Sequence, residues 1–121
     1  MEEFEFEIEF YEKENGDVPV KEFLLSLDNK MRAKMIRTIE MLRHNGYELR
    51  EPYSKNIGNG IMELRAKIGS DITRVMYFFV VGRKAILTNG FVKKTQKTPE
   101  EEIERAKRYR ADYLSRKENA K

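Results

Sequence analysis

The chain contains no cysteine, no tryptophan and only one histidine. Without cysteine it can form neither a disulfide nor a Cys-ligated zinc site, which is compatible with a reducing cytoplasm. A single histidine, His44, excludes a Cys–His nucleophilic pair and a multi-histidine metal site. It falls at a predicted helix end, where it suits the helix dipole better than a catalytic role. Phosphate-cradling loops and glycine-rich dinucleotide fingerprints are also missing. The sequence therefore predicts no metal and no cofactor.

Long apolar runs are missing as well, and none approaches the length that spans a bilayer. The chain begins MEEFEFEIEF, which is acidic where a signal peptide has a basic start followed by an apolar stretch. A length of 121 residues fits one domain, residues 1–121, that buries a core without metal or disulfide. We expect a cytoplasmic protein with no membrane contact.

Charge is unevenly distributed along the chain. Between Lys55 and Lys97 there are nine cationic residues and only two acidic ones, a local net charge of +7 in a chain whose total is +3. Residues 1–14 instead hold seven acidic residues and one lysine. A small sheet with a concentrated cationic face suits a polyanion, either a phosphate backbone or an acidic protein segment. The acidic end either pairs with this basic region or solvates an edge strand, and charged edge strands are common.

The first half of the chain predicts a strand and two helices. Apolar residues alternate with glutamates from Glu3 to Phe10, which is the period of a strand. After a turn at Asn15–Asp17, a short helix follows, with Asp17 as its cap and Pro19 in its first turn. Its apolar stripe is Val20, Phe23, Leu24 and Leu27; the next helix has Met31, Met35, Ile36, Ile39 and Leu42 and ends near Gly46. The two helices form an antiparallel hairpin, and residues 47–59 are expected to be a polar loop.

The second half predicts three strands and a helix. In the first strand Met62, Leu64, Ala66 and Ile68 face the core, while Glu63, Arg65 and Lys67 face out. Residues 72–81 are apolar on both faces, as in a central strand, and residues 84–94 form the last strand. Thr98–Glu101 reads as a capping box with Pro99 at the first helical position. The expected fold is α+β, with an antiparallel sheet of about four strands, an N-terminal helical hairpin and a C-terminal helix whose tail frays from about residue 115.

An ordered series of residues resembles the RelE/ParE toxin superfamily, and within it the HigB-like, phage-derived toxins of type II toxin–antitoxin systems. The resemblance covers nearly the whole chain and implies the RelE-like fold. It is carried by Phe23–Leu24, Gly46, Leu49, Pro52, Lys55, Gly60, Glu63–Leu64–Arg65, Arg74, Tyr77, Gly90–Lys94, Lys97 and Pro99.

Arg74 stands out because a cation inside an otherwise apolar strand is costly unless it is paired or reaches a surface. It is either a structural ion pair with Glu63 or a guanidinium that grips phosphate. The resemblance favours the second role and extends it to Arg65, Lys94 and Lys97 as catalytic residues. Lys97 also precedes a helix N-terminus, which attracts anions. The expected RNA-binding residues are Lys55, Lys67, Lys93 and Tyr77, although Tyr77 also fits core packing with a satisfied hydroxyl.

The resemblance implies a ribosome-dependent endoribonuclease that cuts messenger RNA without metal and arrests translation. In such a site Arg65 and Arg74 clamp phosphate while the 2′-hydroxyl attacks it, and Lys94 or Lys97 transfers protons with a pKa lowered by neighbouring cations. The implied partners are the ribosome, messenger RNA and a cognate antitoxin of the HigA-like, helix-turn-helix kind. One departure is that residues 98–101 supply neither the tyrosine nor the histidine that some members place there.

Two other functions remain open from the sequence. ParE-like members share the fold and poison DNA gyrase without cutting RNA, but the Glu63–Arg65 and Phe91–Lys94 elements favour the HigB-like branch. A small basic domain that only binds RNA or a protein partner is the third possibility.

Overall fold

The computed structural model describes residues 5–93 and 97–119. The elements run β1 (Glu7–Phe10), α1 (Pro19–Ser26), α2 (Asn29–Asn45), the 3₁₀ turn η2 (Gly46–Glu48), β2 (Ser54–Gly58), β3 (Ile61–Ile68), β4 (Asp71–Val80), β5 (Lys84–Lys93) and α3 (Glu100–Asn119). The expected α+β class is confirmed. Helix α3 continues through Asn119, past the point where the sequence predicted a frayed tail.

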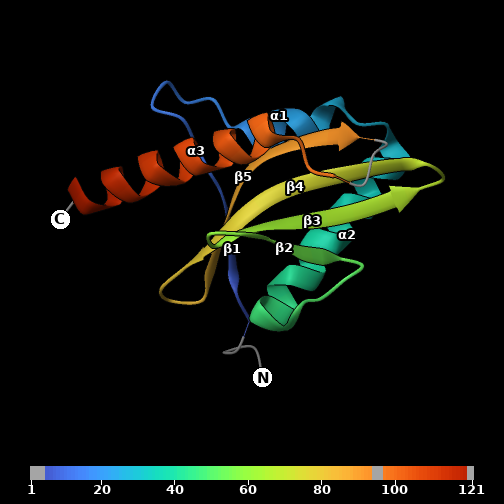
Figure 1. Ribbon diagram of the computed structural model, residues 1–121, viewed down its shortest axis with the longest axis horizontal. Helices are drawn as coiled ribbons and strands as arrows, with labels where there is room; N and C mark the ends of the chain where they lie inside the picture. The colour runs from blue at the N-terminus through green and yellow to red at the C-terminus, as the bar shows by residue number, and fades with distance from the viewer. Residues whose placement is uncertain (1–4, 94–96, 120–121) are drawn as a thin grey trace.

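The sheet has five strands in the order β1-β5-β4-β3-β2 (Figure 1). Three neighbouring pairs are antiparallel, but β1 and β5 run parallel, so the sheet is mixed rather than antiparallel. The fifth strand is β2, which lies inside the predicted polar loop because its sequence, SKNIG, has no apolar alternation to announce it. The central position of β4 is confirmed, since it is buried on both faces over most of its length.

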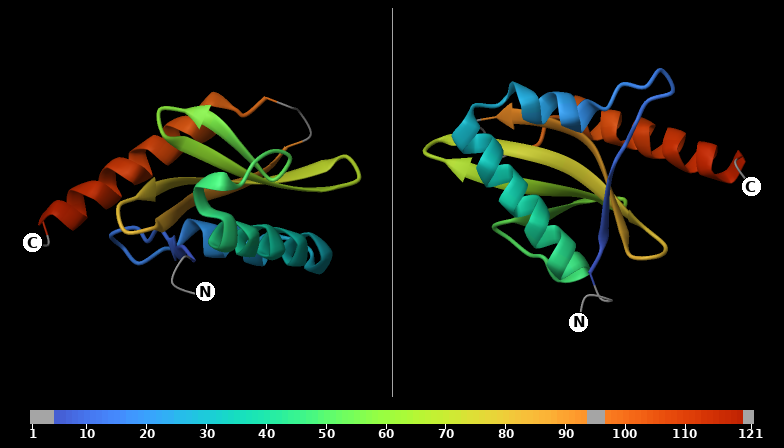
Figure 2. Two further views of the ribbon diagram at one scale, coloured as in Figure 1. Left: turned by 90° about the horizontal axis from the view of Figure 1, so that it is seen from below. Right: turned by 180° about the vertical axis from the view of Figure 1, so that it is seen from behind.

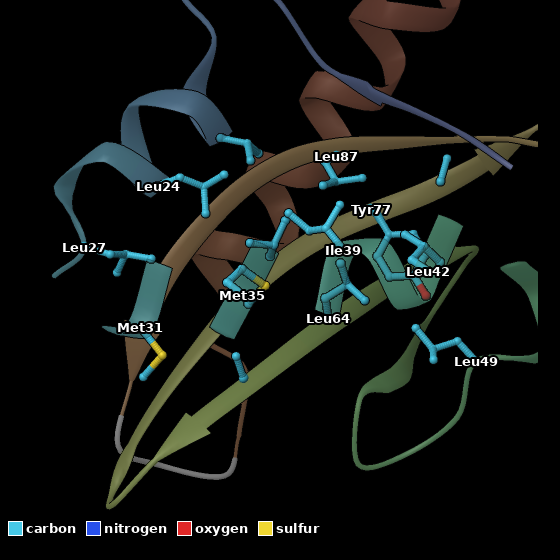
Figure 3. Close-up of a cluster of buried hydrophobic side chains, with 14 residues drawn as sticks. Leu24, Leu27, Met31, Met35, Ile39, Leu42, Leu49, Leu64, Tyr77 and Leu87 are labelled. Atoms are coloured by element: carbon cyan, nitrogen blue, oxygen red, sulfur yellow. The ribbon is translucent and has the colours of Figure 1, made fainter. Parts of the chain in front are cut away.

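Helices cover both faces of the sheet (Figure 2). The α1–α2 hairpin packs on one face, where its predicted apolar stripes meet Leu64, Val75, Tyr77 and Leu87 of the sheet in the largest hydrophobic cluster (Figure 3). Ile36 is the exception to the stripe and is 45% exposed. Helix α3 lies on the opposite face. Its predicted stripe is confirmed and packs in two smaller clusters through Ile103, Ala106, Tyr109 and Tyr113.

The helix ends show how local sequence is used. Asp28 caps α2 through a hydrogen bond that its Oδ1 accepts from the N–H of Met31 (2.8 Å). The residue at the N-cap of α1 is Val18, so the expected cap by Asp17 is wrong; Pro19 does occupy the first turn. Helix α3 begins at Glu100, one residue after Pro99, so Pro99 precedes the first helical position.

The segment directly after β1 and the end of α3 are joined by polar contacts. The Tyr11 hydroxyl donates to Asp112 Oδ2 (2.5 Å), and Arg116 donates to the same carboxylate and to the carbonyl of Glu12. These bonds lower the pKa of Asp112, while burial and then Asp112 raise the pKa of Tyr11 to about 12. Strand β1 lies at the sheet edge with Glu7 exposed, as the charged-edge interpretation predicts, and Glu9 pairs with Lys84 at 3.3 Å.

Candidate functional site

The register of the sheet brings two of the predicted arginines together. Arg65 of β3 lies directly opposite Arg74 of β4, and Arg74 lies opposite Phe91 of β5. Both arginines are on the face covered by α3, since Met76, two residues after Arg74, packs there against Ala106. Like charges in directly opposite positions repel each other. A counter-charge is therefore needed for this arrangement.

Glu63 supplies this counter-charge and is completely buried. Its Oε1 accepts a hydrogen bond from Arg65 Nε (2.8 Å), and its Oε2 lies 4.0 Å from Arg74 Nη1. The Thr98 hydroxyl, from the segment before α3, donates to the same Oε2 (2.6 Å). Two predictions are corrected here. The sequence predicted that Glu63 faces solvent and that Thr98 belongs to a capping box for the last helix. Glu63 is instead buried, because the α3 side of β3 is a second buried layer, and the Thr98 hydroxyl bonds Glu63 of β3.

Arg74 has no exposed surface in this conformation. Its guanidinium lies 5.9 Å from the centre of the Phe91 ring, a cation–π distance. Burial lowers the pKa of Arg74, the charge of Glu63 raises it, and the charge of Arg65 lowers it again. The structure thus shows the ion pair with Glu63 that the sequence left as one alternative. Of the two arginines, Arg65 is the one that reaches solvent, since its side chain is 14% exposed.

The predicted lysines lie around these two arginines to different extents. Lys55 is opposite Glu63 in the β2–β3 register and is partly buried, and Lys67 is exposed two residues after Arg65. Lys97 is exposed next to Thr98. The Cα of Lys93 pairs with that of Ile72, across β4 from Lys67. The Lys93 side chain and all of Lys94 lie outside the described residues.

Tyr77 does not belong to this group. It is on the other face of β4, which packs against α2, and only 1% of it is exposed. Its hydroxyl shares a 2.6 Å hydrogen bond with Ser54 Oγ, and burial raises its pKa. The core interpretation is therefore confirmed, and a direct RNA contact by Tyr77 is excluded in this conformation. The odd spacing from Arg74 already placed the two side chains on opposite faces of a regular strand.

Two residues of the site were not predicted to belong to it. Glu63 was considered only as an ion-pair partner, and Thr98 only as a helix cap. The one available signal was Arg74 itself, because a buried arginine requires a buried acid, and Glu63 is one of only two acidic residues between Lys55 and Lys97.

The described residues contain no group of three or more histidine, cysteine, aspartate or glutamate side chains that could hold a metal ion. Within residues 5–93 and 97–119, no helix has the length and apolar character to cross a membrane.

Comparison with known proteins identifies a family for this chain. A search of curated proteins finds no match. A family model described as phage derived protein Gp49-like (DUF891) matches residues 22–111, which extend from α1 into α3 and include Glu63, Arg65, Arg74 and Thr98. The family is a RelE-like, toxin-like one. Because the match covers most of the chain, this protein belongs to the phage-derived Gp49-like family.

Proposed function

We propose that this protein is the toxin of a toxin–antitoxin module and acts as a ribosome-dependent, metal-independent messenger RNA endoribonuclease of the HigB-like kind. The observation that supports this best is the position of Arg65. Its side chain is 14% exposed beside a buried Arg74–Glu63 pair, and Lys55, Lys67 and Lys97 lie along or beside the same sheet face. The membership of a toxin-like family agrees with it.

In this proposal Arg65 contacts the scissile phosphate. Glu63 holds the Arg65 side chain in place through the hydrogen bond that its Oε1 accepts from Arg65 Nε. Arg74 acts from behind as a fixed positive charge in a dry environment, where a charge has more effect than in water. It is thus a positioning residue rather than a direct phosphate ligand, which modifies the clamp predicted from the sequence.

The reaction needs one proton removed from the 2′-hydroxyl and one delivered to the leaving 5′-oxygen. The 2′-oxygen forms a bond to phosphorus as the bond to the 5′-oxygen breaks, giving a cyclic phosphate and a free 5′-hydroxyl. We assign the proton transfers to Lys97 and Lys94. Lys97 is one residue from Thr98, whose bond to Glu63 fixes this segment beside the arginines. The toxin's partner in this proposal is a cognate antitoxin, whose acidic segment would cover the cationic face.

The test is cleavage mapping of a defined message in a reconstituted translation reaction, with and without ribosomes. Wild-type protein is expected to cut only translated message, at a fixed place within codons. Arg65→Ala is expected to slow cutting about 10²- to 10³-fold, the usual cost of one charge-stabilising donor. Arg108→Ala, an exposed arginine on α3, is the matched control and is expected to leave the rate unchanged.

Intact message under both conditions, with folded protein, would refute the nuclease. A DNA-damage response on induction would then identify a gyrase poison, whereas no growth inhibition would identify a module that only binds a partner.

A further inference from the structure

Strand β3 is longer than its outer neighbour, which leaves part of its edge open. Strand β2 begins at Ser54, opposite Leu64. Arg65 still donates its backbone N–H to the carbonyl of Tyr53 (2.9 Å), and the chain then turns away. Among the described residues, 66–68 have strand partners only in β4. The open edge is flanked by α2 on one side and by the segment before β2 on the other.

A groove of about 500 Å³ occupies this open edge. Its lining includes the cationic side chains of Lys34, Arg65 and Lys67, the hydroxyl-bearing Thr38 and the ring of Tyr53; the described residues that line it include no acidic one. Tyr53 is 43% exposed, so a large part of it is accessible to solvent. The groove combines positive charge with an accessible aromatic ring, which is the combination that binds single-stranded nucleic acid.

The groove suits a nucleotide better than an added peptide strand. A peptide strand needs the free carbonyls and N–H groups of the edge. The carbonyl of Lys67 is already occupied, because the Lys34 ammonium donates to it at 2.6 Å. A lysine on an open edge is a common device against strand pairing. The same ammonium has further N–H groups, which remain suitable donors to a phosphate oxygen.

Arg65 connects this groove to Arg74 and Glu63 of the candidate site, since it lines the groove and also bonds Glu63. A strand whose phosphate lies at Arg65 can therefore continue along β3 without leaving positive surface. We propose that the groove is a subsite for a nucleotide flanking the scissile phosphate of a single-stranded RNA, with its phosphate on Lys34 and Lys67 and its base stacked on Tyr53. This assignment rests on the proposed RNA substrate.

The experiment measures equilibrium binding of a fluorescein-labelled ten-nucleotide RNA to the full chain by anisotropy, over a series of salt concentrations and without ribosomes. Tyr53→Ala is expected to weaken binding at least about fivefold, since a stacked base contributes at the lower end about 1 kcal/mol. Tyr53→Phe keeps the ring and is expected to bind as wild type. Lys34→Gln is expected to reduce the log–log salt slope by about 0.7, the value for one lost phosphate contact.

Lys21→Gln, which removes an exposed positive charge from α1, is the matched control for Lys34. Thermal melting of each variant confirms that it is folded. The subsite is refuted if Tyr53→Ala binds like Tyr53→Phe, or if Lys34→Gln behaves like Lys21→Gln. An oligomer with the same phosphates but no bases must bind more weakly than the RNA, and equal binding also overturns the stacked base.

Binding is measured without cleavage, so the two proposals fail separately. If the wild-type protein does not cut message in the translation assay, while Tyr53→Ala and Lys34→Gln still weaken RNA binding as expected, only the nuclease is refuted. If a glutamate-rich peptide displaces the RNA and Tyr53→Ala has no effect, the groove is a site for an acidic protein segment and the RNA subsite is refuted.

Discussion

Replacing Glu63 by glutamine tests whether the buried carboxylate is what allows two arginines to lie opposite each other. The substitution keeps the size and shape of the side chain, removes its charge and replaces one acceptor oxygen by an NH2 donor. Arg74 is completely buried and would then face Arg65 without the charge of Glu63. The Thr98 hydroxyl keeps an acceptor, because the amide oxygen of glutamine replaces Oε2. The amide NH2 then takes the place of Oε1 and cannot accept from Arg65 Nε, so the expected effect combines the lost charge with one lost hydrogen bond.

The magnitude follows from the burial of the pair. Removing one partner of a buried ion pair costs about 3–5 kcal/mol, because the other charge stays desolvated. Arg65 is partly exposed and contributes less than Arg74, so we expect the lower end, about 3 kcal/mol. Domains of this size have total stabilities of about 5–15 kcal/mol. A loss of this size lowers the melting temperature on the order of 10 °C.

The assay is urea unfolding followed by circular dichroism, with Glu104→Gln as the control. Glu104 forms a 3.6 Å ion pair with Lys107 on the surface of α3 and is 55% exposed, so its loss is expected to change stability by less than about 0.5 kcal/mol. The double variant Glu63→Leu, Arg74→Met removes both buried charges and is expected to recover much of the lost stability. Equal unfolding midpoints for Glu63→Gln and Glu104→Gln would refute the reasoning.

Two further predictions concern packing and pH. A Cβ at position 90 would lie 2.3 Å from Cδ2 of Phe23, so Gly90→Ala is expected to destabilise the fold by about 1–3 kcal/mol in urea unfolding. Adding Phe23→Leu should restore part of this loss, and an unchanged midpoint for the single variant would contradict the close packing. The pKa of Asp112 is lowered first by its hydrogen bond from Tyr11 and then by that from Arg116. A lowered pKa in the folded state gives stability that is present above the unfolded pKa of about 4 and is lost as pH falls through the folded value. Asp112→Asn should therefore destabilise the protein at pH 7 and approach wild-type stability at acid pH, and a difference that is constant with pH would be evidence against the contact.

Local sequence patterns predicted most of the elements. The stripes of α1, α2 and α3 and the alternation that includes β1 were sufficient because each element buries one face, and its apolar residues repeat with the period of that element. The polar strand β2 has no such period, so it was read as a loop. The parallel pairing of β1 with β5 was also missed, since no local signal distinguishes it from antiparallel pairing between strands so far apart in the chain.

The site was predicted less completely, for a different reason. The sequence singled out Arg74 and Arg65 and named Glu63 as the acid that would pair with a buried arginine. It did not predict that the carboxylate is buried, because burial on the α3 side depends on where a distant helix packs. Lys34 and Tyr53 were not considered at all, since they come from α2 and from the segment before β2 and meet Lys67 only in the folded chain.

The sequence by itself determined the family, the class of fold and the concentration of positive charge between Lys55 and Lys97. Only the tertiary structure decided which charges act together. The strand register set Arg65 against Arg74, and α3 with the Thr98 segment enclosed Arg74 and Glu63 while Arg65 remained at the surface. The physical reason is that the effect of a charge depends on its distance from other charges and on its exposure to water. Both quantities are set by contacts between residues that are far apart in the sequence.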